Sequence, residues 1–286
     1  MTNSNALYIV ATPIGNLGDI TLRAIETLKT ADIIAAEDTR HSAKLLQYYG
    51  IDTPLTPYHD HSNDTQTQRL LDKLQEGRSI ALISDAGTPL ISDPGFRLVV
   101  LAREQKIRVV PIPGACAVVT ALSAAGLPSD RFSFEGFLPA KNAGRRARLE
   151  LVVTDPRTLI FYESPHRIQD SLADMAAIFG QDRQAVLARE ITKTYETFLS
   201  GDFAQLQQVL SEDANQLRGE MVVMVHGYSE PLADPERLEP DVETMLRVLL
   251  DELPLKQAAA IAAKLSGEKK NKLYKWAVDN KGATEK

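Results

Sequence analysis

Short apolar runs alternate with amphipathic stretches through the first half of the chain. The runs at residues 7–11, 33–36, 80–83 and 107–110 are rich in Ile, Val, Leu and Ala, which predicts buried strands. The stretches between them predict helices, as in the three-residue spacing of Leu22, Ile25 and Leu28. Strands that alternate with helices favour a parallel sheet with right-handed crossovers, so the pattern predicts an α/β fold.

Each predicted strand is followed by a polar connection of unusual composition. The connection at residues 84–94 reads SDAGTPLISDP, whereas a strand-to-helix connection usually needs only about two to six residues. Asp93 and Pro94 fit the N-cap and the first position of the next helix. Because the carboxyl ends of parallel strands meet at one edge of a sheet, we expect all four connections to surround one binding pocket.

The second half of the chain is organised differently. Five apolar or alternating runs predict strands, at residues 131–137, 158–162, 184–188, 195–200 and 221–226. Two of these runs follow each other closely enough to favour an antiparallel hairpin, and therefore a mixed sheet, with helices near 168–179 and 203–210. We expect an N-terminal α/β domain over 1–126, a second α/β domain over 127–229, an acidic linker over 230–240 and a helix-turn-helix-like tail over 241–286.

Composition places the chain among ordinary globular proteins. Of its 286 residues, 44% are hydrophobic and 24% charged, and a single cysteine excludes an internal disulfide. The sequence contains no secretory signal pattern and no apolar run of membrane-spanning length. These features predict a cytoplasmic protein without a membrane partner.

The net charge of −6 is unevenly distributed along the sequence. Residues 229–252 contain eight acidic residues and two arginines, which equals the whole net charge and leaves the remainder neutral. Within that remainder, one basic cluster contains Arg145 and Arg146 beside Gly144, which favours a flexible loop, and another contains Lys269 and Lys272 in the tail. Local basic patches contact nucleic-acid phosphates, so both clusters are candidate RNA contacts, although solvated surface faces also fit the pattern.

The connections do not fit the common nucleotide-binding or metal-binding motifs. Gly15 and Gly18 supply only a fragment of a dinucleotide-binding glycine pattern, although Glu37 and Asp38 lie where a ribose-binding acid is expected. The sequence lacks a P-loop lysine, a G-x-S-x-G motif and paired Cys/His spacing. The HDH motif at residues 59–61 is interpreted as a polar surface loop, because a third metal ligand at a sensible spacing is missing, and no metal is expected.

Taken together, the connections resemble those of a known family. The motifs at residues 10–21, 35–41, 84–95, 121–128, 136–139, 161–167 and 188–193 are similar to those of the bacterial ribosomal RNA small subunit methyltransferase I family. The resemblance implies the tetrapyrrole-methylase fold, with two α/β domains, a ligand cleft between them and a small helical tail. It also implies a homodimer that uses S-adenosylmethionine to methylate the ribose 2′-oxygen of a cytidine in the decoding region of 16S ribosomal RNA, within the 30S subunit or as free RNA.

The resemblance also implies which residues hold the cofactor. Thr88 stands where the fold usually has an acid, and whether Asp85 takes that role stays open. The cofactor-binding residues that the resemblance implies are Pro13, Gly15, Asp85, Gly87, Thr88, Ile91, Cys116, Ala117, Tyr162, Ala188 and Val225. For Cys116, Ala117 and Ala188, simple helix or strand packing is the alternative interpretation.

Attack by a ribose hydroxyl on a sulfonium methyl needs a proton acceptor and benefits from a nearby cation. Asp38, Glu37 and His41 are candidate proton acceptors, and Arg40, Arg189 and Lys193 are candidate cations. Of these we predict Asp38, Arg40 and Lys193 as the catalytic residues, with N-capping by Asp38 as the alternative. Two other functions stay open at this point. One is methylation of a tetrapyrrole or corrinoid, since fold alone does not fix the substrate. The other is an RNA-binding factor that holds S-adenosylmethionine as a structural ligand.

Overall fold

The computed structural model describes residues 6–59, 64–229 and 238–280. The chain divides into two compact units, residues 1–228 and 229–286. Among the described residues, the first unit contains two five-stranded sheets and the second contains three helices. The described residues contain no helix that combines the length and the apolar character needed to cross a membrane.

The first sheet is parallel throughout and has the order β3-β2-β4-β1-β5. Its strands are β1 (Ala6–Val10), β2 (Ile33–Ala36), β3 (Leu55–Pro57), β4 (Ile80–Ile83) and β5 (Arg108–Ile112). The sequence predicted four of them and missed β3, a three-residue edge strand that contains a threonine and a proline. The parallel α/β arrangement is confirmed.

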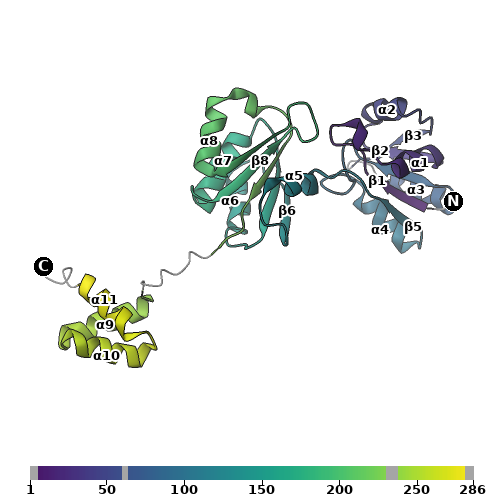
Figure 1. Ribbon diagram of the computed structural model, residues 1–286. Coiled ribbons are helices and arrows are strands. Elements are labelled where there is room, and N and C mark those ends of the chain that lie inside the picture. The colour runs from purple at the N-terminus through teal and green to yellow at the C-terminus, as the bar shows by residue number, and fades with distance from the viewer. Residues whose placement is uncertain (1–5, 60–63, 230–237, 281–286) are drawn as a thin grey trace. The chain divides into compact units, whose positions relative to one another are not determined.

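Helices cover both faces of this sheet (Figure 1). One face packs against α1 (Leu22–Thr30) and α2 (Thr39–Tyr48), and the other against α3 (Asp64–Gln75) and α4 (Phe96–Glu104). Alternate residues of β2 and β4 enter the two cores, since Ile34 and Ala81 pack on one side and Ala35 and Leu82 on the other. The expected burial of Leu22 is wrong, because its side chain is 81% exposed and Ala24 and Leu28 form the buried face of α1.

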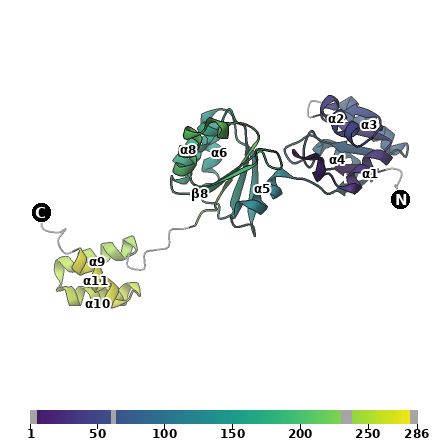
Figure 2. The same ribbon diagram turned by 45° about the horizontal axis from the view of Figure 1, so that its top comes forward.

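The second sheet is mixed, as expected, and has the order β6-β7-β10-β8-β9. Its strands are β6 (Phe132–Phe137), β7 (Thr158–Glu163), β8 (Gln184–Arg189), β9 (Thr197–Asp202) and β10 (Met221–Val225). Only β6 and β7 are parallel, and β8 and β9 form the predicted antiparallel hairpin. One face packs against α6 (Asn142–Glu150), α7 (Ile168–Phe179) and α8 (Phe203–Glu212), whereas α5 (Ala117–Ala125) lies on the other face (Figure 2).

Helix α6 corrects the expectation of a flexible basic loop around Gly144. Residues 142–150 are helical, and Arg145 is 4% exposed. Its Nε donates to Asp174 Oδ2 on α7 at 2.6 Å, and Arg146 Nη1 lies 3.3 Å from the other oxygen of the same carboxylate. Arg145 is therefore an internal residue that joins α6 to α7.

The tail consists of α9 (Pro240–Glu252), α10 (Leu255–Ser266) and α11 (Lys270–Asp279) around a small core that includes Leu246, Ala259 and Leu273. Gly267 ends α10 with a φ of 77°, a backbone conformation that glycine adopts without strain. Trp276 packs against the core, and the Arg247 guanidinium lies 4.9 Å from its ring centroid. Trp276 thus takes a structural role in the tail. Most of the expected linker lies outside the described residues.

Candidate active site

The connection between β4 and α4 has an unusual backbone. Leu90 and Ser92 have φ values of 73° and 66°, in the left-handed region that non-glycine residues rarely adopt. Helix α4 begins at Phe96 with Gly95 as its N-cap, so the prediction that Asp93 and Pro94 start the helix is wrong. Gly95 has a φ of 129°, and a Cβ there would lie 2.7 Å from Leu82 Cδ2. The helix start is thus delayed, and Asp93 lines a pocket instead of capping α4.

The four connections after β1, β2, β4 and β5 meet at one edge of the first sheet, as predicted. Thr12 and Gly87 exchange two backbone hydrogen bonds, at 2.8 and 3.1 Å. Asp38 N–H donates to Asp85 Oδ1 at 3.0 Å, and Thr88 Oγ1 donates to the Ala115 carbonyl at 2.9 Å. These bonds tie each connection to the long one that follows β4.

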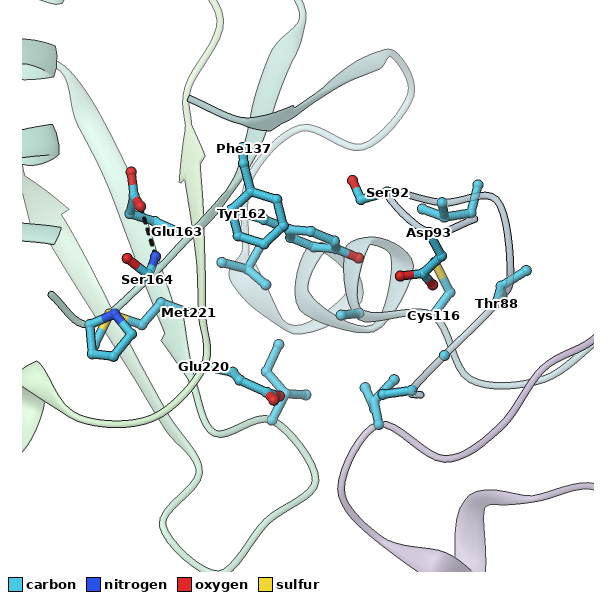
Figure 3. Close-up of a pocket in the computed structure, with 18 residues that line it drawn as sticks. Thr88, Ser92, Asp93, Cys116, Phe137, Tyr162, Glu163, Ser164, Glu220 and Met221 are labelled. Carbon is cyan, nitrogen blue, oxygen red and sulfur yellow. Dashed lines mark hydrogen bonds between the residues drawn. The ribbon is translucent and has the colours of Figure 1, made fainter. Parts of the chain in front are cut away.

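A pocket of about 340 Å³ opens beside this edge (Figure 3). Three connections of the first sheet contribute Ile14, Ala86, Gly87, Thr88, Ile91, Ser92, Asp93, Cys116 and Ala117. Elements of the second sheet contribute Phe137, Tyr162, Glu163, Ser164, Pro165, Ile191, Glu220, Met221 and Val222. The connection after β2 does not line this pocket, although Asp38 in it is hydrogen-bonded to Asp85 in the connection after β4.

Carboxylates are the charged groups of this lining. Among the described lining residues, Asp93, Glu163 and Glu220 are acidic and none is a lysine, arginine or histidine. Burial raises the pKa of the Tyr162 phenol, and Cys116 and the Asp93 carboxylate raise it further. Figure 3 shows the Tyr162 and Asp93 side chains pointing toward each other across the pocket. The pocket therefore suits a ligand that is apolar in part and positively charged in part.

Glu163 and Glu220 both have basic partners. Glu163 is 3% exposed, and its Oε1 accepts hydrogen bonds from the Ser164 N–H at 2.7 Å and from Arg167 Nε at 3.0 Å. Glu220 Oε2 lies 3.0 Å from Lys193 Nζ, which also contacts Glu190 at 2.9 Å. Burial opposes ionisation of Glu190, but the Glu220 N–H and the Lys193 ammonium lower its pKa overall.

Six of the predicted cofactor-binding residues line the pocket: Gly87, Thr88, Ile91, Cys116, Ala117 and Tyr162. Pro13 and Gly15 flank the lining residue Ile14 but do not line the pocket themselves. Gly15 permits a close approach by the 190–196 segment, since a Cβ there would lie 2.5 Å from Lys193 Cγ.

The other three predicted cofactor-binding residues lie outside the pocket for different reasons. The Asp85 carboxylate accepts a hydrogen bond from the backbone of Asp38. Ala188 is fully buried in the core between α5 and the second sheet. The prediction for Val225 is wrong, because Val225 packs in the core on the other face of that sheet, whereas Val222 lies on the α5 face.

The predicted catalytic residues also lie outside the pocket. Asp38 Oδ1 caps α2 by accepting from the N–H groups of Arg40 and His41, at 2.8 and 3.4 Å, and these hydrogen bonds lower its pKa. The Arg40 side chain is 93% exposed. Lys193 reaches the pocket only through its ion pair with Glu220. The capping interpretation of Asp38 is therefore the one that the structure supports.

Sequence reasoning missed several residues for which a signal was available. Glu163, Ser164 and Pro165 stand at the end of a predicted strand, inside one of the family-like motifs, yet received no role. Asp93 was interpreted only as a helix cap. For metals, the described residues hold no cluster of three potential ligands, and Asp60 and His61 of the HDH motif lie outside them.

The tail carries the remaining candidates for RNA contact. Lys269 is exposed at the N-terminus of α11, and Lys272 Nζ lies 2.9 Å from Glu268 Oε1. Lys264, Lys270 and Lys275 are also exposed.

Comparison with known proteins agrees with this architecture. Residues 6–207 match the tetrapyrrole (corrin/porphyrin) methylases, and residues 236–281 match the RsmI C-terminal HTH domain. The crystal structure of uroporphyrin-III-C-methyltransferase from Thermus thermophilus is 20% identical with a TM-score of 0.52, over 78% of this chain and 94% of that one. The cobalt precorrin-4 methyltransferase CbiF is 16% identical with a TM-score of 0.56, over 77% and 94%. These two similarities show the fold.

Sequence relatives are much closer. The ribosomal RNA small subunit methyltransferase I of Pseudomonas aeruginosa is 55% identical, over 98% of this chain and 99% of its own length. The protein of the same name from Escherichia coli O157:H7 is 56% identical, over 96% of each. This chain therefore belongs to the ribosomal RNA small subunit methyltransferase I family, within the tetrapyrrole methylases.

Proposed function

We propose that the chain transfers a methyl group from S-adenosylmethionine to the ribose 2′-oxygen of a cytidine in the decoding region of 16S ribosomal RNA. The observation that carries this proposal is the largely apolar pocket with acidic side chains in its lining, in a chain whose near-full-length relatives are named for ribosomal RNA small subunit methylation. The proposal includes a homodimer, a cytoplasmic location and the 30S subunit or its RNA as substrate.

The lining of the pocket fits the proposed cofactor. Apolar side chains such as Ile14, Ile91 and Val222 suit an adenosine, and the small residues Gly87 and Ala117 leave room for it. The carboxylates suit a sulfonium and an ammonium group, because negative charge attracts these cations. When bound, S-adenosylmethionine would supply an electrophilic methyl group.

We assign proton removal to Asp93. As the new O–C bond forms at the ribose oxygen, the bond between the methyl group and the sulfonium sulfur would break and the sulfur would leave as a neutral thioether. The hydroxyl proton would pass to the Asp93 carboxylate. Asp93 lines the pocket, and its side chain points toward that of Tyr162 (Figure 3). The raised pKa keeps the Tyr162 phenol protonated at neutral pH, so Tyr162 serves as a hydrogen-bond donor. Lys193 takes a positioning role through Glu220.

In this proposal the tail and the acidic pocket contact different parts of the RNA. A pocket lined by carboxylates repels phosphates, so the RNA backbone has to be held by other parts of the protein. Exposed lysines such as Lys264, Lys269 and Lys270 are suited to that role. This feature favours an RNA substrate over a tetrapyrrole, which needs no basic tail.

The test is methyl transfer from cofactor labelled in the methyl group. Purified protein is incubated with 30S particles from cells that lack the enzyme, with the naked 16S RNA and with a tetrapyrrole such as uroporphyrinogen. Label in RNA that resists alkaline cleavage at one cytidine supports the proposal. Label only in the tetrapyrrole supports the alternative substrate, and cofactor binding without any transfer supports the non-enzymatic alternative.

A further inference from the structure

Strand β6 contains a bulge beside the pocket. Phe134 pairs with Ile160 of β7, but Gly136 pairs with Phe161, so Glu135 is an extra residue in the ladder. Because of this shift, Phe137 pairs with Tyr162, whereas in an unbroken ladder it would pair with Glu163. The bulge thus turns Phe137 onto the same face of the sheet as Phe134.

Ring contacts confirm this placement. The centroids of Phe134 and Tyr162 lie 4.8 Å apart with an interplanar angle of 65°, and those of Phe137 and Tyr162 lie 5.4 Å apart at 63°. Residues three positions apart on a regular strand point to opposite faces and cannot contact one ring in this way. The Tyr162 ring therefore supports Phe137 edge-on and fixes its orientation.

Several interactions hold the bulge in place. Gly136 has a φ of 68°, which a residue with a Cβ adopts only with strain. The Glu135 side chain is 5% exposed, and its carboxylate accepts hydrogen bonds from Arg148 Nη2 at 2.6 Å and from Ser133 Oγ. Specific side-chain contacts thus stabilise the bulge, and the bulge sets the position of the Phe137 ring.

Phe137 lines the pocket and is nevertheless 55% exposed. In Figure 3 its ring lies beside Tyr162 and across the pocket from Ser92 and Asp93. A Cβ on Gly136 would lie 3.7 Å from Ser92 Oγ, so the bulge is next to the strained connection that carries Asp93. An exposed and rigidly supported ring close to the proposed proton acceptor is suited to a flat ligand group.

We propose that Phe137 stacks against the base of the target nucleotide after that base has been displaced from the RNA. This inference rests on the proposed function and adds how the substrate is held. Sequence-specific enzymes bind single-stranded RNA by stacking unstacked bases on aromatic side chains. A neutral ring also suits this pocket, whose described lining contains no lysine or arginine to bind phosphate. The stack places the ribose of the same nucleotide toward Asp93.

The test compares substitutions of Phe137 with one of Phe132. Phe132 lies on the same strand and is 41% exposed but does not line the pocket, so Phe132→Ala is the matched control. The variants Phe137→Ala, Phe137→Leu and Phe137→Tyr are assayed for KM toward 30S particles, and calorimetry measures their Kd for S-adenosylmethionine. We expect Phe137→Ala and Phe137→Leu to raise KM about 10-fold or more, with Kd unchanged. Phe137→Tyr and Phe132→Ala should keep KM near the wild-type value.

Other results would overturn the stacking role. If Phe137→Leu restores KM as well as Phe137→Tyr does, the side chain contributes only apolar packing. If the Kd for the cofactor rises by the same factor as KM, the ring contacts the cofactor and not the base. An unchanged KM in Phe137→Ala, with an active wild-type enzyme, refutes only the stacking role. A wild-type chain that methylates no ribosomal substrate refutes the proposed function and the stacking role with it.

Discussion

Replacement of Arg145 separates a structural role from an RNA-binding role. The side chains of Arg145 and Asp174 are 5% and 8% exposed, so their ion pair lies inside the protein. Removing one member of a buried pair leaves the other charge without compensation, which typically costs about 3–5 kcal/mol. Asp174 keeps hydrogen bonds from Asn142 at 2.8 and 2.9 Å and a contact with Arg146. We therefore expect Arg145→Ala to lower the free energy of unfolding by about 3 kcal/mol, the low end of that range.

Arg146→Ala is the matched control. Arg146 contacts the same carboxylate at 3.3 Å, but its side chain is 43% exposed, so its loss should cost at most about 1 kcal/mol. Urea unfolding followed by circular dichroism measures both effects. With a slope near 3 kcal/mol/M, Arg145→Ala should lower the midpoint by about 1 M. RNA affinity is measured in parallel, at a temperature where each variant is folded.

Two results would refute this reasoning. If Arg145→Ala unfolds at the wild-type midpoint, the buried ion pair does not stabilise the junction of α6 and α7. If the folded variant loses more RNA affinity than Arg146→Ala does, Arg145 contacts RNA despite its burial. If Arg145→Ala is less stable than Arg146→Ala but binds RNA with the same affinity, the structural role of Arg145 is supported.

Three further predictions concern the pocket and the tail. Asp93→Asn should lower kcat for methyl transfer at least about 100-fold when it is measured at saturating cofactor; an unchanged kcat would exclude Asp93 as the proton acceptor. The lowered pKa of Glu190 means that its ionised form stabilises the fold above its ordinary value of 4.5, and this contribution is lost as the pH falls through the lowered pKa. Lys193→Met should therefore cost stability at neutral pH and progressively less below about pH 4.5, as measured by urea unfolding across that range; a cost that does not depend on pH would contradict this. Deletion of residues 240–286 should weaken RNA binding and reduce its salt dependence with cofactor affinity unchanged, whereas equal losses of both would mark the tail as structural.

The hydrophobic pattern predicted the elements whose pattern of buried residues continues from one end of the element to the other. The run at residues 80–83 is buried throughout as β4, and the helix near 168–179 coincides with α7. The first follows from a continuous apolar run and the second from the helical spacing of apolar residues, both of which are local patterns. Strand β3 was missed because a short edge strand buries little, and its backbone pairing depends on β2.

Side-chain partners that are distant in sequence account for the errors about charge. The basic cluster at Arg145 has the composition of a surface patch, and the decisive fact is Asp174, which is 29 residues away and lies on α7. Val225 is a different kind of error, because period-two alternation along β10 already places it opposite Val222. Stricter use of that rule on the sequence would have removed Val225 from the predicted site.

The most informative residues of the pocket break local rules. Asp93 precedes a proline and has the features of a helix cap, yet α4 starts only at Phe96. Two non-glycine residues with positive φ, Leu90 and Ser92, come just before Asp93. Phe137 belongs to a strand pattern that would turn it away from the pocket, yet the bulge at Glu135 and Gly136 reverses its face. In both places strained or irregular backbone gives a side chain a position that local preference does not favour. Such departures persist where surrounding contacts impose them, and they concentrate at functional sites. The two irregular segments lie next to each other, at Ser92 and Gly136, which is the strongest structural reason to place substrate chemistry there.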